Sequence, residues 1–203
     1  MSEINDAGPA EHGSDARLRL VDAMTTVIAE KGYAATTIGD IVASAHVSRR
    51  TFYEHFADKE ECLLVCHTIL GDHMLNAITT AFTAGLSTQT QISDSVHALM
   101  RALSERPNLT NTHFVTMQAA GPKARQARRD VQTRFAGVLQ GLAAQVRATE
   151  PSVKVPSAMM ATALVGGIGE LIVQSVERGR VNRLDEIAPT VVELISAVLR
   201  APD

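Results

Sequence analysis

The stretch TTIGDIVASAHVSRRTFYEHFADKEECL, residues 36–63, contains two short helical patterns with a turn between them. In the first pattern, apolar residues from Ile38 to Ala45 recur at i, i+3, i+4 and i+7, which places them on one face of a helix. Thr37 precedes this helix as an N-cap, and Asp40 follows three residues later at the spacing of a capping box. The pattern predicts a short amphipathic helix that ends at about Ala45.

A second short helix is predicted to begin after Ser48, which is a suitable N-cap. Phe52 and Phe56 lie at i and i+4, so both rings can face the core while Arg50 faces outward and Tyr53 lies on a flank. Two short helices joined by a turn of three or four residues form a helix-turn-helix pattern, whose second helix can enter the major groove of DNA. The same spacing fits equally a solvated helix with a packed aromatic pair.

The composition is compatible with a folded protein and excludes a strongly basic one. The chain has 203 residues, 45% of them hydrophobic, and a formal net charge of −3, so any basic surface has to arise from the placement of residues. Two cysteines do not make a disulfide framework, and they favour the reducing cytoplasm. No apolar run reaches the roughly 18 residues that span a bilayer, so no membrane partner is expected.

The rest of the chain has the periodicity of helices, and the sequence predicts an all-α fold with about nine of them. The expected helices cover 15–31, 37–45, a short segment after 48, 58–84, 88–106, 108–119, 122–148, 156–178 and 185–200. Residues 1–14 are expected to form a disordered, slightly acidic tail. The predicted domains are 15–60 and 61–203, and the long fourth helix belongs to both halves of the chain.

Residues 36–63 resemble the DNA-binding signature of the TetR family of transcriptional repressors, because capping, core and contact positions fall in register. The resemblance implies an N-terminal three-helix helix-turn-helix domain and a C-terminal domain for ligand binding and dimerisation. It also implies a homodimer that binds double-stranded, palindromic operator DNA and leaves it when a small-molecule effector binds. At His46 the family commonly has glycine, which suits a positive φ better, although histidine tolerates that conformation better than most residues.

The resemblance also assigns DNA contacts by position. It implies phosphate contacts from Thr37 and Ser48, base contacts from Arg49, Arg50 and Thr51, and backbone contacts from Tyr53, His55 and Lys59.

Three glycines interrupt a helical pattern in the stretch GGIGELIVQSVERG, residues 166–179. Each glycine costs roughly 1 kcal/mol relative to alanine in a helix, and close approach of another helix is the natural reason for accepting that cost. Together with the resemblance, the pattern predicts a dimer interface formed by Gly166, Gly167, Gly169, Leu171, Val191, Ile195, Val198 and Leu199. The alternative is a close contact within one chain.

The sequence does not define a single effector pocket. Candidate lining residues and polar anchors are His73, His97, Met100, Leu103, His113, Phe114, Met117, Gln118, Phe135, Glu170 and Gln174. Each of them fits an ordinary core or surface position as well. The run of Arg125, Arg128 and Arg129 is most simply interpreted as a solvated face.

Two alternatives stay open besides the ligand-responsive regulator. Cys62, Cys66 and His67 could form a metal or thiol sensor on the same scaffold, although the two cysteines also fit small buried positions and zinc requires more ligands. An enzyme built on a helical bundle is the remote alternative. The chain has no nucleophile elbow, phosphate-binding loop or paired-carboxylate motif, so neither catalysis nor a cofactor is expected.

Overall fold

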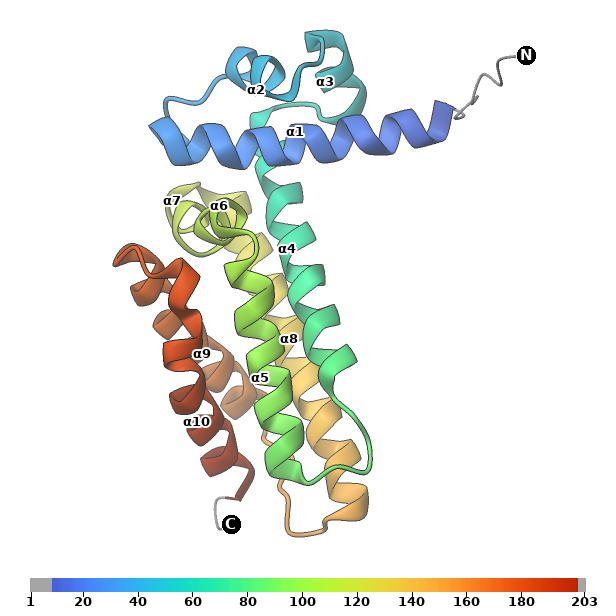
Figure 1. The fold of residues 1–203 in the computed structure, drawn as a ribbon, viewed down its shortest axis with the longest axis vertical. Coiled ribbons are helices and arrows are strands. Elements are labelled where there is room, and N and C mark those ends of the chain that lie inside the picture. The colour runs from blue at the N-terminus through green and yellow to red at the C-terminus, as the bar shows by residue number, and fades with distance from the viewer. Residues whose placement is uncertain (1–8, 201–203) are drawn as a thin grey trace, which may run out of the picture. The chain divides into compact units, whose positions relative to one another are not determined.

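The computed structural model describes the backbone of residues 9–200 and the side chains of residues 15–200. Within this range the chain contains helices and no strands, so the all-α prediction is confirmed (Figure 1). The elements are α1 (Pro9–Lys31), α2 (Ile38–Ala45), α3 (Arg49–His55), α4 (Lys59–Ala81), α5 (Thr88–Ser104), α6 (Pro107–Asn111), the π-helical turn η1 (Thr112–Thr116), α7 (Met117–Ala119), α8 (Pro122–Thr149), α9 (Ala158–Glu177), the 3₁₀ segment η2 (Val181–Ile187) and α10 (Ala188–Arg200). The helix α6, the turn η1 and the helix α7 follow one another without a break, where the sequence predicts one helix.

The chain divides into two compact units, Met1–Cys66 and His67–Asp203. The division lies within α4, which therefore contributes residues to both units.

The first unit is held together by apolar side chains from each of its helices. Leu20 and Met24 of α1, Ile41 of α2 and Phe52 of α3 are fully buried, as is Phe56, which follows α3. The helix α1 packs against α2 and α3, because these apolar faces can leave water only against one another.

The start of α1 corrects one sequence-based expectation. The helix begins at Pro9, whereas the sequence places residues 1–14 in a tail; residues 1–8 lie outside the described residues. Proline fits the first position of a helix, because its fixed φ suits the helix and its missing N–H has no partner there. At the other end, Gly32 adopts a φ of 79° and stops the helix as predicted.

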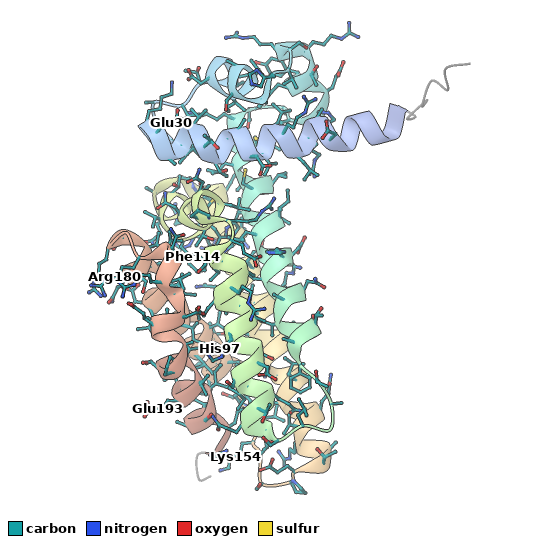
Figure 2. All side chains as sticks on the ribbon, viewed as in Figure 1. Glu30, His97, Phe114, Lys154, Arg180 and Glu193 are labelled. Carbon is teal, nitrogen blue, oxygen red and sulfur yellow. The ribbon has the colours of Figure 1, made fainter. Side chains whose placement is uncertain are left out.

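The second unit is a bundle of long helices (Figures 1 and 2). The helix α8 packs against α9, and α5 packs against α10 and η2. In this unit α4 is anchored to α8 by an ion pair of 2.5 Å between Asp72 and Arg134. Phe114 marks one end of the bundle in Figure 2, and Lys154 marks the opposite end.

Two helices, α4 and α9, are long and apolar enough to cross a membrane by length and composition alone. This is weak evidence for a membrane segment, because core helices of soluble proteins pass the same test. In α4 the apolar positions include Cys62, Leu63, Leu70 and Met74, which are buried inside the protein. The length and hydropathy of α4 are therefore accounted for by the core that it helps to form.

Candidate nucleic-acid interface and ligand cavity

The two short helices of the first unit begin with the predicted caps. Thr37 caps α2 in a complete capping box: its hydroxyl accepts from the backbone N–H of Asp40, and the Asp40 carboxylate accepts from the N–H of Thr37. Ser48 caps α3 by accepting from the backbone N–H of Thr51 at 3.0 Å. These caps fix where each helix begins and therefore which side chains α3 presents on each face.

The turn between α2 and α3 depends on His46. This residue has φ 54° and ψ 44°, in the left-handed region, and it is the one described non-glycine residue with a positive φ. Its N–H donates to the carbonyls of Val42 and Ala43, which ends α2. The turn is therefore made with histidine, at some conformational cost, in the conformation that glycine adopts most easily.

The exposed and buried faces of α3 are sharply separated. Phe52 is 0% exposed and packs against Phe56 with ring centroids 5.5 Å apart, whereas Tyr53 is 57% exposed. The Arg50 side chain is 90% exposed and forms an ion pair of 3.1 Å with Glu54 one turn later. Arg49 is exposed as well, and its guanidinium lies beside Gly39 of α2. Arginine and tyrosine on one solvent-facing helix surface can contact base edges and phosphates.

The remaining predicted DNA contacts lie close to this face. Thr51 and His55 are half-buried, while Thr37 and Ser48 are exposed at their helix starts. An ion pair of 2.6 Å between Lys31 and Asp40 supports the start of α2. The Lys31 ammonium, followed by the hydroxyl and N–H of Thr37, holds the pKa of the Asp40 carboxyl below its usual range.

Lys59 has a structural role that the sequence does not predict. Its ammonium donates to the backbone carbonyls of Tyr33 at 2.9 Å and Thr36 at 2.8 Å, and it lies 4.4 Å from the centroid of the Tyr33 ring. The side chain is therefore engaged within the first unit, where it ties the start of α4 to the segment that follows α1.

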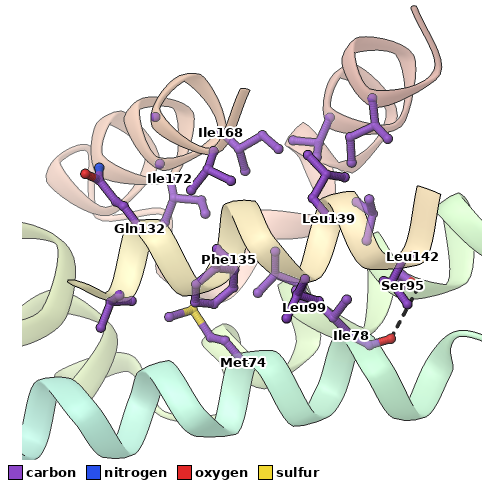
Figure 3. Close-up of a pocket in the computed structure, with 18 of the residues that line it drawn as sticks. Met74, Ile78, Ser95, Leu99, Gln132, Phe135, Leu139, Leu142, Ile168 and Ile172 are labelled. Atoms are coloured by element: carbon purple, nitrogen blue, oxygen red, sulfur yellow. Dashed lines mark hydrogen bonds between the residues drawn. The ribbon is translucent and has the colours of Figure 1, made fainter. Parts of the chain in front are cut away.

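The second unit contains a cavity of about 250 Å³, close to the lower end of the range for small-molecule sites, roughly 300–1,000 Å³. Its wall is mostly apolar and comes from α4, α5, η1, α7, α8, α9 and α10. Figure 3 shows part of this wall: Met74 and Ile78 of α4, Ser95 and Leu99 of α5, Gln132, Phe135, Leu139 and Leu142 of α8, and Ile168 and Ile172 of α9. The hydroxyl of Ser95 donates to the carbonyl of Ile78 at 3.4 Å, which joins α5 to α4 beside the cavity.

Some of the predicted effector residues line the cavity, and others lie elsewhere. Phe114, Gln118, Phe135 and Glu170 line it, as does His113. The structure does not bring the other candidates to the cavity wall: His73, His97, Met100, Leu103, Met117 and Gln174. Met100, Leu103 and Met117 are fully buried core residues, and exposed His97 bonds to the carbonyl of Ser93 on its own helix.

Two histidines are stacked at one end of the cavity. The rings of His67 and His113 are 3.9 Å apart at their centroids, and Nδ1 of His113 donates to the carbonyl of His67 at 3.2 Å. Burial lowers the pKa of His67 to about 4; the Ala127 carbonyl opposes this shift and the positive charge of Arg128 adds to it. Burial also lowers the pKa of His113 well below its usual value, with smaller contributions from His67 and Arg128. Both imidazoles are therefore neutral at pH 7.

Among the described residues, no atom lies close to the open side of the three glycines in the middle of α9. A Cβ atom at Gly166, Gly167 or Gly169 would meet nothing within 4 Å. The structure therefore shows no close contact at these glycines within the described part of the chain. Gly166 and Gly169 line the cavity, whereas Gly167 is exposed.

The other predicted interface residues also divide between cavity and surface. Val191, Ile195 and Leu199 line the cavity, while Leu171 and Val198 are half-buried outside its wall. Met159 is 84% exposed at the start of α9, so this helix has an apolar surface near its first turns.

Cys62 and Cys66 are free, buried cysteines. A hydrogen bond with the Cys62 side chain, followed by burial, raises the pKa of the Cys66 thiol, which keeps it protonated. The Cys66 sulfur lies 3.8 Å from the carbonyl of Val21. Among the described residues, no group of three or more His, Cys, Asp or Glu side chains could hold a metal ion. Nothing in this geometry favours the metal- or thiol-sensing alternative.

Arg128 is a cavity residue that the sequence analysis does not predict, since the run of three arginines is interpreted there as a solvated face. Arg125 and Arg129 are indeed exposed, but Arg128 is half-buried and lines the cavity. A signal was present in the sequence: Arg128 is followed at i+4, i+7 and i+11 by Gln132, Phe135 and Leu139. It is the one charged residue on the stripe of α8 that faces the cavity.

Residues 20–66 match the family model described as "Bacterial regulatory proteins, tetR family". An uncharacterized HTH-type transcriptional regulator, YxbF, from Bacillus subtilis (strain 168) is 32% identical over 107 residues. That match covers 52% of this chain and 27% of the relative, so the matched part corresponds to about a quarter of that protein's length.

Solved structures of regulators share the fold at low sequence identity. The fatty acid degradation regulator FadR from Bacillus halodurans has a TM-score of 0.78 at 18% identity, with coverage of 95% of this chain and 97% of that chain. FadR from Bacillus subtilis, crystallised in complex with stearoyl-CoA, has a TM-score of 0.75 at 18% identity, with coverage of 91% and 99%. PfmR from Thermus thermophilus has a TM-score of 0.68 at 20% identity, with coverage of 91% and 99%.

The family match begins within α1 and includes α2, the His46 turn, α3 and the start of α4, where caps, core and exposed arginines have the arrangement described above. On this evidence residues 20–66 of the chain are similar to the tetR family of bacterial regulatory proteins.

Proposed function

We propose that this protein is a homodimeric, ligand-responsive transcriptional repressor of the cytoplasm, which binds a palindromic operator and is released by a small molecule. The observation that carries the proposal is the two-sided α3 helix, whose Phe52 is fully buried while Arg50 and Tyr53 face solvent. A helix anchored in this way can lie in the major groove with its first turn on base edges. Residues 15–60 then form the DNA-binding domain, and residues 61–203 bind ligand and dimerise.

In this proposal Arg49, Arg50 and Thr51 approach bases, while Thr37, Ser48, Tyr53 and His55 contact the sugar-phosphate backbone. The exposed arginines supply bidentate donors of the kind that recognise guanine. Lys59 holds the start of α4 by its two carbonyl contacts. Its main proposed role is therefore to position α4 within the first unit, and contact with a DNA phosphate is a secondary role.

Dimerisation is proposed to use α9 and α10. The α9 surface carries exposed Met159 and Met160 in its first turn and exposed Gly167 two turns later, with no intrachain atom near the glycine. Small residues on an exposed helix face allow a second helix to approach closely. Two copies related by a twofold axis would read half-sites about one helical turn apart, roughly 34–36 Å, or a near multiple.

Release is proposed to start in the cavity. The helix α4 supplies His67, Met74 and Ile78 to the cavity wall and continues without a break from the first unit. A ligand that changes how α4 packs can therefore act on the DNA-binding unit through this helix. The ligand must bind one state of the protein more tightly than the other. Operator DNA must then lower the affinity for the ligand by the same factor by which the ligand lowers the affinity for the operator.

Selection of bound fragments from genomic DNA with the purified full chain tests this function. The expected result is enrichment of one palindromic motif, with affinity that falls steeply as salt increases. The variant Arg50→Ala should lose base preference within each half-site. Recovery of no motif from the selection, or binding by wild type without sequence preference, would contradict the proposal.

A further inference from the structure

The cavity has one end at which three nitrogen-bearing side chains from different elements meet. His67 comes from α4, His113 from η1 and Arg128 from α8, and all three line the cavity. The two imidazole rings are stacked with centroids 3.9 Å apart. The charge of Arg128 acts on both histidines, so the three groups form one cluster, which we call the cationic end.

Arg128 has no counterion within the described part of the chain. Its side chain is half-buried, and no described carboxylate lies within ion-pair distance of it. The exposed Arg129 bonds to Gln126 on the same helix, and Arg134 pairs with Asp72. A guanidinium held against an apolar cavity without a partner is costly, and an anion bound beside it would remove that cost.

His67 supplies the second, independent observation. The residue is 2% exposed, and neither of its ring nitrogens has a hydrogen-bond partner among the described residues. The backbone of Ala127 lies near the ring and raises the pKa of His67, but the contact does not meet hydrogen-bond geometry. Buried polar nitrogens are normally satisfied, so two unsatisfied ones on a cavity wall indicate a ligand atom that hydrogen-bonds there. A neutral imidazole can donate one such bond and accept another.

The residues that line the remainder of the cavity are predominantly apolar, and on α8 they extend over several turns of the helix. Arg128 and Val146 both line it and lie 18 residues apart on α8, which corresponds to about 27 Å at 1.5 Å per residue. Between them the wall of α8 consists of one amide, Gln132, and apolar residues such as Phe135 and Leu139.

Among the other polar groups on the cavity wall, the buried side-chain oxygen of Gln91 has no hydrogen-bond partner among the described residues. This oxygen is an acceptor and therefore does not suit an anion. Near the far end, the amide nitrogen of Gln91 donates to the carbonyl of Thr83 at 2.9 Å. Glu170, which is the single carboxylate among the described residues of the wall, accepts from Gln174 on α9. The cationic end is therefore the part of the cavity best suited to a charged group of a ligand.

We propose that the effector is an elongated amphipathic anion: its carboxylate or phosphate head group binds Arg128, His67 and His113, and its straight apolar chain lies between α4, α5, α8 and α9. The inference rests on the proposed function, because it specifies the ligand of the same cavity. A compact or cationic effector does not match a long apolar wall that ends at an unpaired guanidinium.

Matched ligands with one chain and different head groups test this inference on the full-length protein. Isothermal titration calorimetry is carried out with a series of straight-chain fatty acids, the corresponding alkyl phosphates and the corresponding fatty alcohols, all below micelle formation. For at least one chain length, the fatty acid or the alkyl phosphate should have a dissociation constant about tenfold or more below that of the alcohol. If the fatty acid binds more tightly, the head group of the effector is a carboxylate. If the alkyl phosphate binds more tightly, the head group is a phosphate.

Variants locate the head group. Arg128→Gln should reduce affinity for the preferred anion about tenfold or more and leave the alcohol unchanged, while Arg128→Lys should restore part of the loss. Arg125→Gln, an exposed arginine one turn earlier on α8, is the matched control and should bind like wild type. His67→Gln should reduce the affinity for the anion by a smaller factor than Arg128→Gln does.

The outcomes separate this inference from the proposed function. Binding of anions that depends on Arg128, with no effect on operator binding, supports the ligand class and contradicts release by the ligand. Operator release by a ligand that binds equally to wild type and Arg128→Gln supports the regulator and overturns the cationic end. Failure of every anion in the series to bind, or alcohols that bind as tightly as acids, overturns the inference as well.

Discussion

The ammonium group of Lys59 donates a hydrogen bond of 2.9 Å to the backbone carbonyl of Tyr33 and lies 4.4 Å from the centroid of the Tyr33 ring. A second hydrogen bond of 2.8 Å reaches the carbonyl of Thr36. One cation at the start of α4 thus satisfies two carbonyls of the segment that joins α1 to α2.

We therefore expect Lys59→Met to lower the free energy of unfolding by about 1–3 kcal/mol, because the carbonyls lose a charged donor while the aliphatic stem is kept. Urea denaturation followed by circular dichroism measures this. Lys31→Met is the comparison, since the Lys31–Asp40 pair is partly exposed and a pair of this kind contributes about 0–1 kcal/mol. Equal stability of Lys59→Met and wild type would show that the contacts carry no net stabilisation.

The left-handed backbone at His46 predicts that glycine stabilises this position. His46→Gly should raise the free energy of unfolding by up to about 1 kcal/mol, because glycine adopts a φ of 54° without a Cβ penalty. His46→Asn should behave like wild type, and His46→Val should be clearly destabilised because a β-branched residue disfavours positive φ. Chemical denaturation of the series measures this order, and a glycine variant less stable than the valine variant would contradict it.

The exposed Arg50–Glu54 pair makes a prediction for DNA binding. Arg50→Ala should reduce discrimination at one or two positions of each half-site by about 1–3 kcal/mol, because a bidentate base contact is lost. Glu54→Gln should strengthen binding to all sequences, because it removes a negative charge beside the phosphates. Fluorescence anisotropy on the selected operator and its single-base variants separates the two effects. Arg147→Ala on α8, also exposed, is the control and should bind like wild type.

A substitution at Gly167 can test the proposed dimer interface, because a larger side chain at this position does not clash with the described residues of its own chain. Within the chain a Cβ atom at this position meets nothing within 4 Å, so Gly167→Leu should fold with equal or greater stability, glycine being worse than leucine in a helix by roughly 1 kcal/mol. Light scattering should nevertheless show a loss of dimer, because the larger side chain overpacks the interface between copies.

Gly137→Leu is the matched control, since Gly137 is an exposed glycine in the middle of α8 with equally open surroundings. This variant should remain dimeric. A Gly167→Leu protein with the same association state as wild type would place the interface elsewhere.

The stacked histidines predict a dependence of stability on pH. The pKa of His67 is lowered from 6.5 to about 4, and that of His113 is lowered in the same direction. Below pH 6.5 the unfolded chain therefore binds protons that the folded chain does not, and the free energy of unfolding falls as the pH decreases toward 4. The contribution of His67 is about 3 kcal/mol in total, present above about pH 6.5 and lost progressively below it.

Thermal or urea unfolding measured from about pH 7 to about pH 5 shows this slope. The double variant with His67→Gln and His113→Gln should flatten it. A wild-type stability that does not change over this interval would contradict the buried, neutral state of the pair.

Much of the first unit is determined by the sequence itself. Thr37, Asp40 and Ser48 cap helices through contacts within four residues, and the 3.6-residue period decides that Phe52 faces inward while Arg50 faces outward. Such local signals are strong because each depends on neighbours along the chain. The left-handed turn at His46 follows from the same local geometry.

The cavity was only partly predictable, because its wall is assembled from seven elements spread over residues 67–199. Phe114 and Phe135 could be named as candidates, but Met100 and Met117 have the same chemistry and are buried in the core. Only the packing of α4, α5, α8 and α9 decides which apolar side chains face one another and which face an unfilled space.

The sequence alone determined most of the helices, the caps of α2 and α3, the buried and exposed faces of α3 and the similarity of residues 20–66 to the tetR family. Tertiary structure alone decided that Lys59 bonds to the segment after α1, that the glycines of α9 have no intrachain neighbour, and that Arg128 meets His67 and His113. The physical reason is range: caps and periodicity act within one or two turns of helix, whereas a lysine, a glycine or an arginine takes its role from residues brought near it by folding.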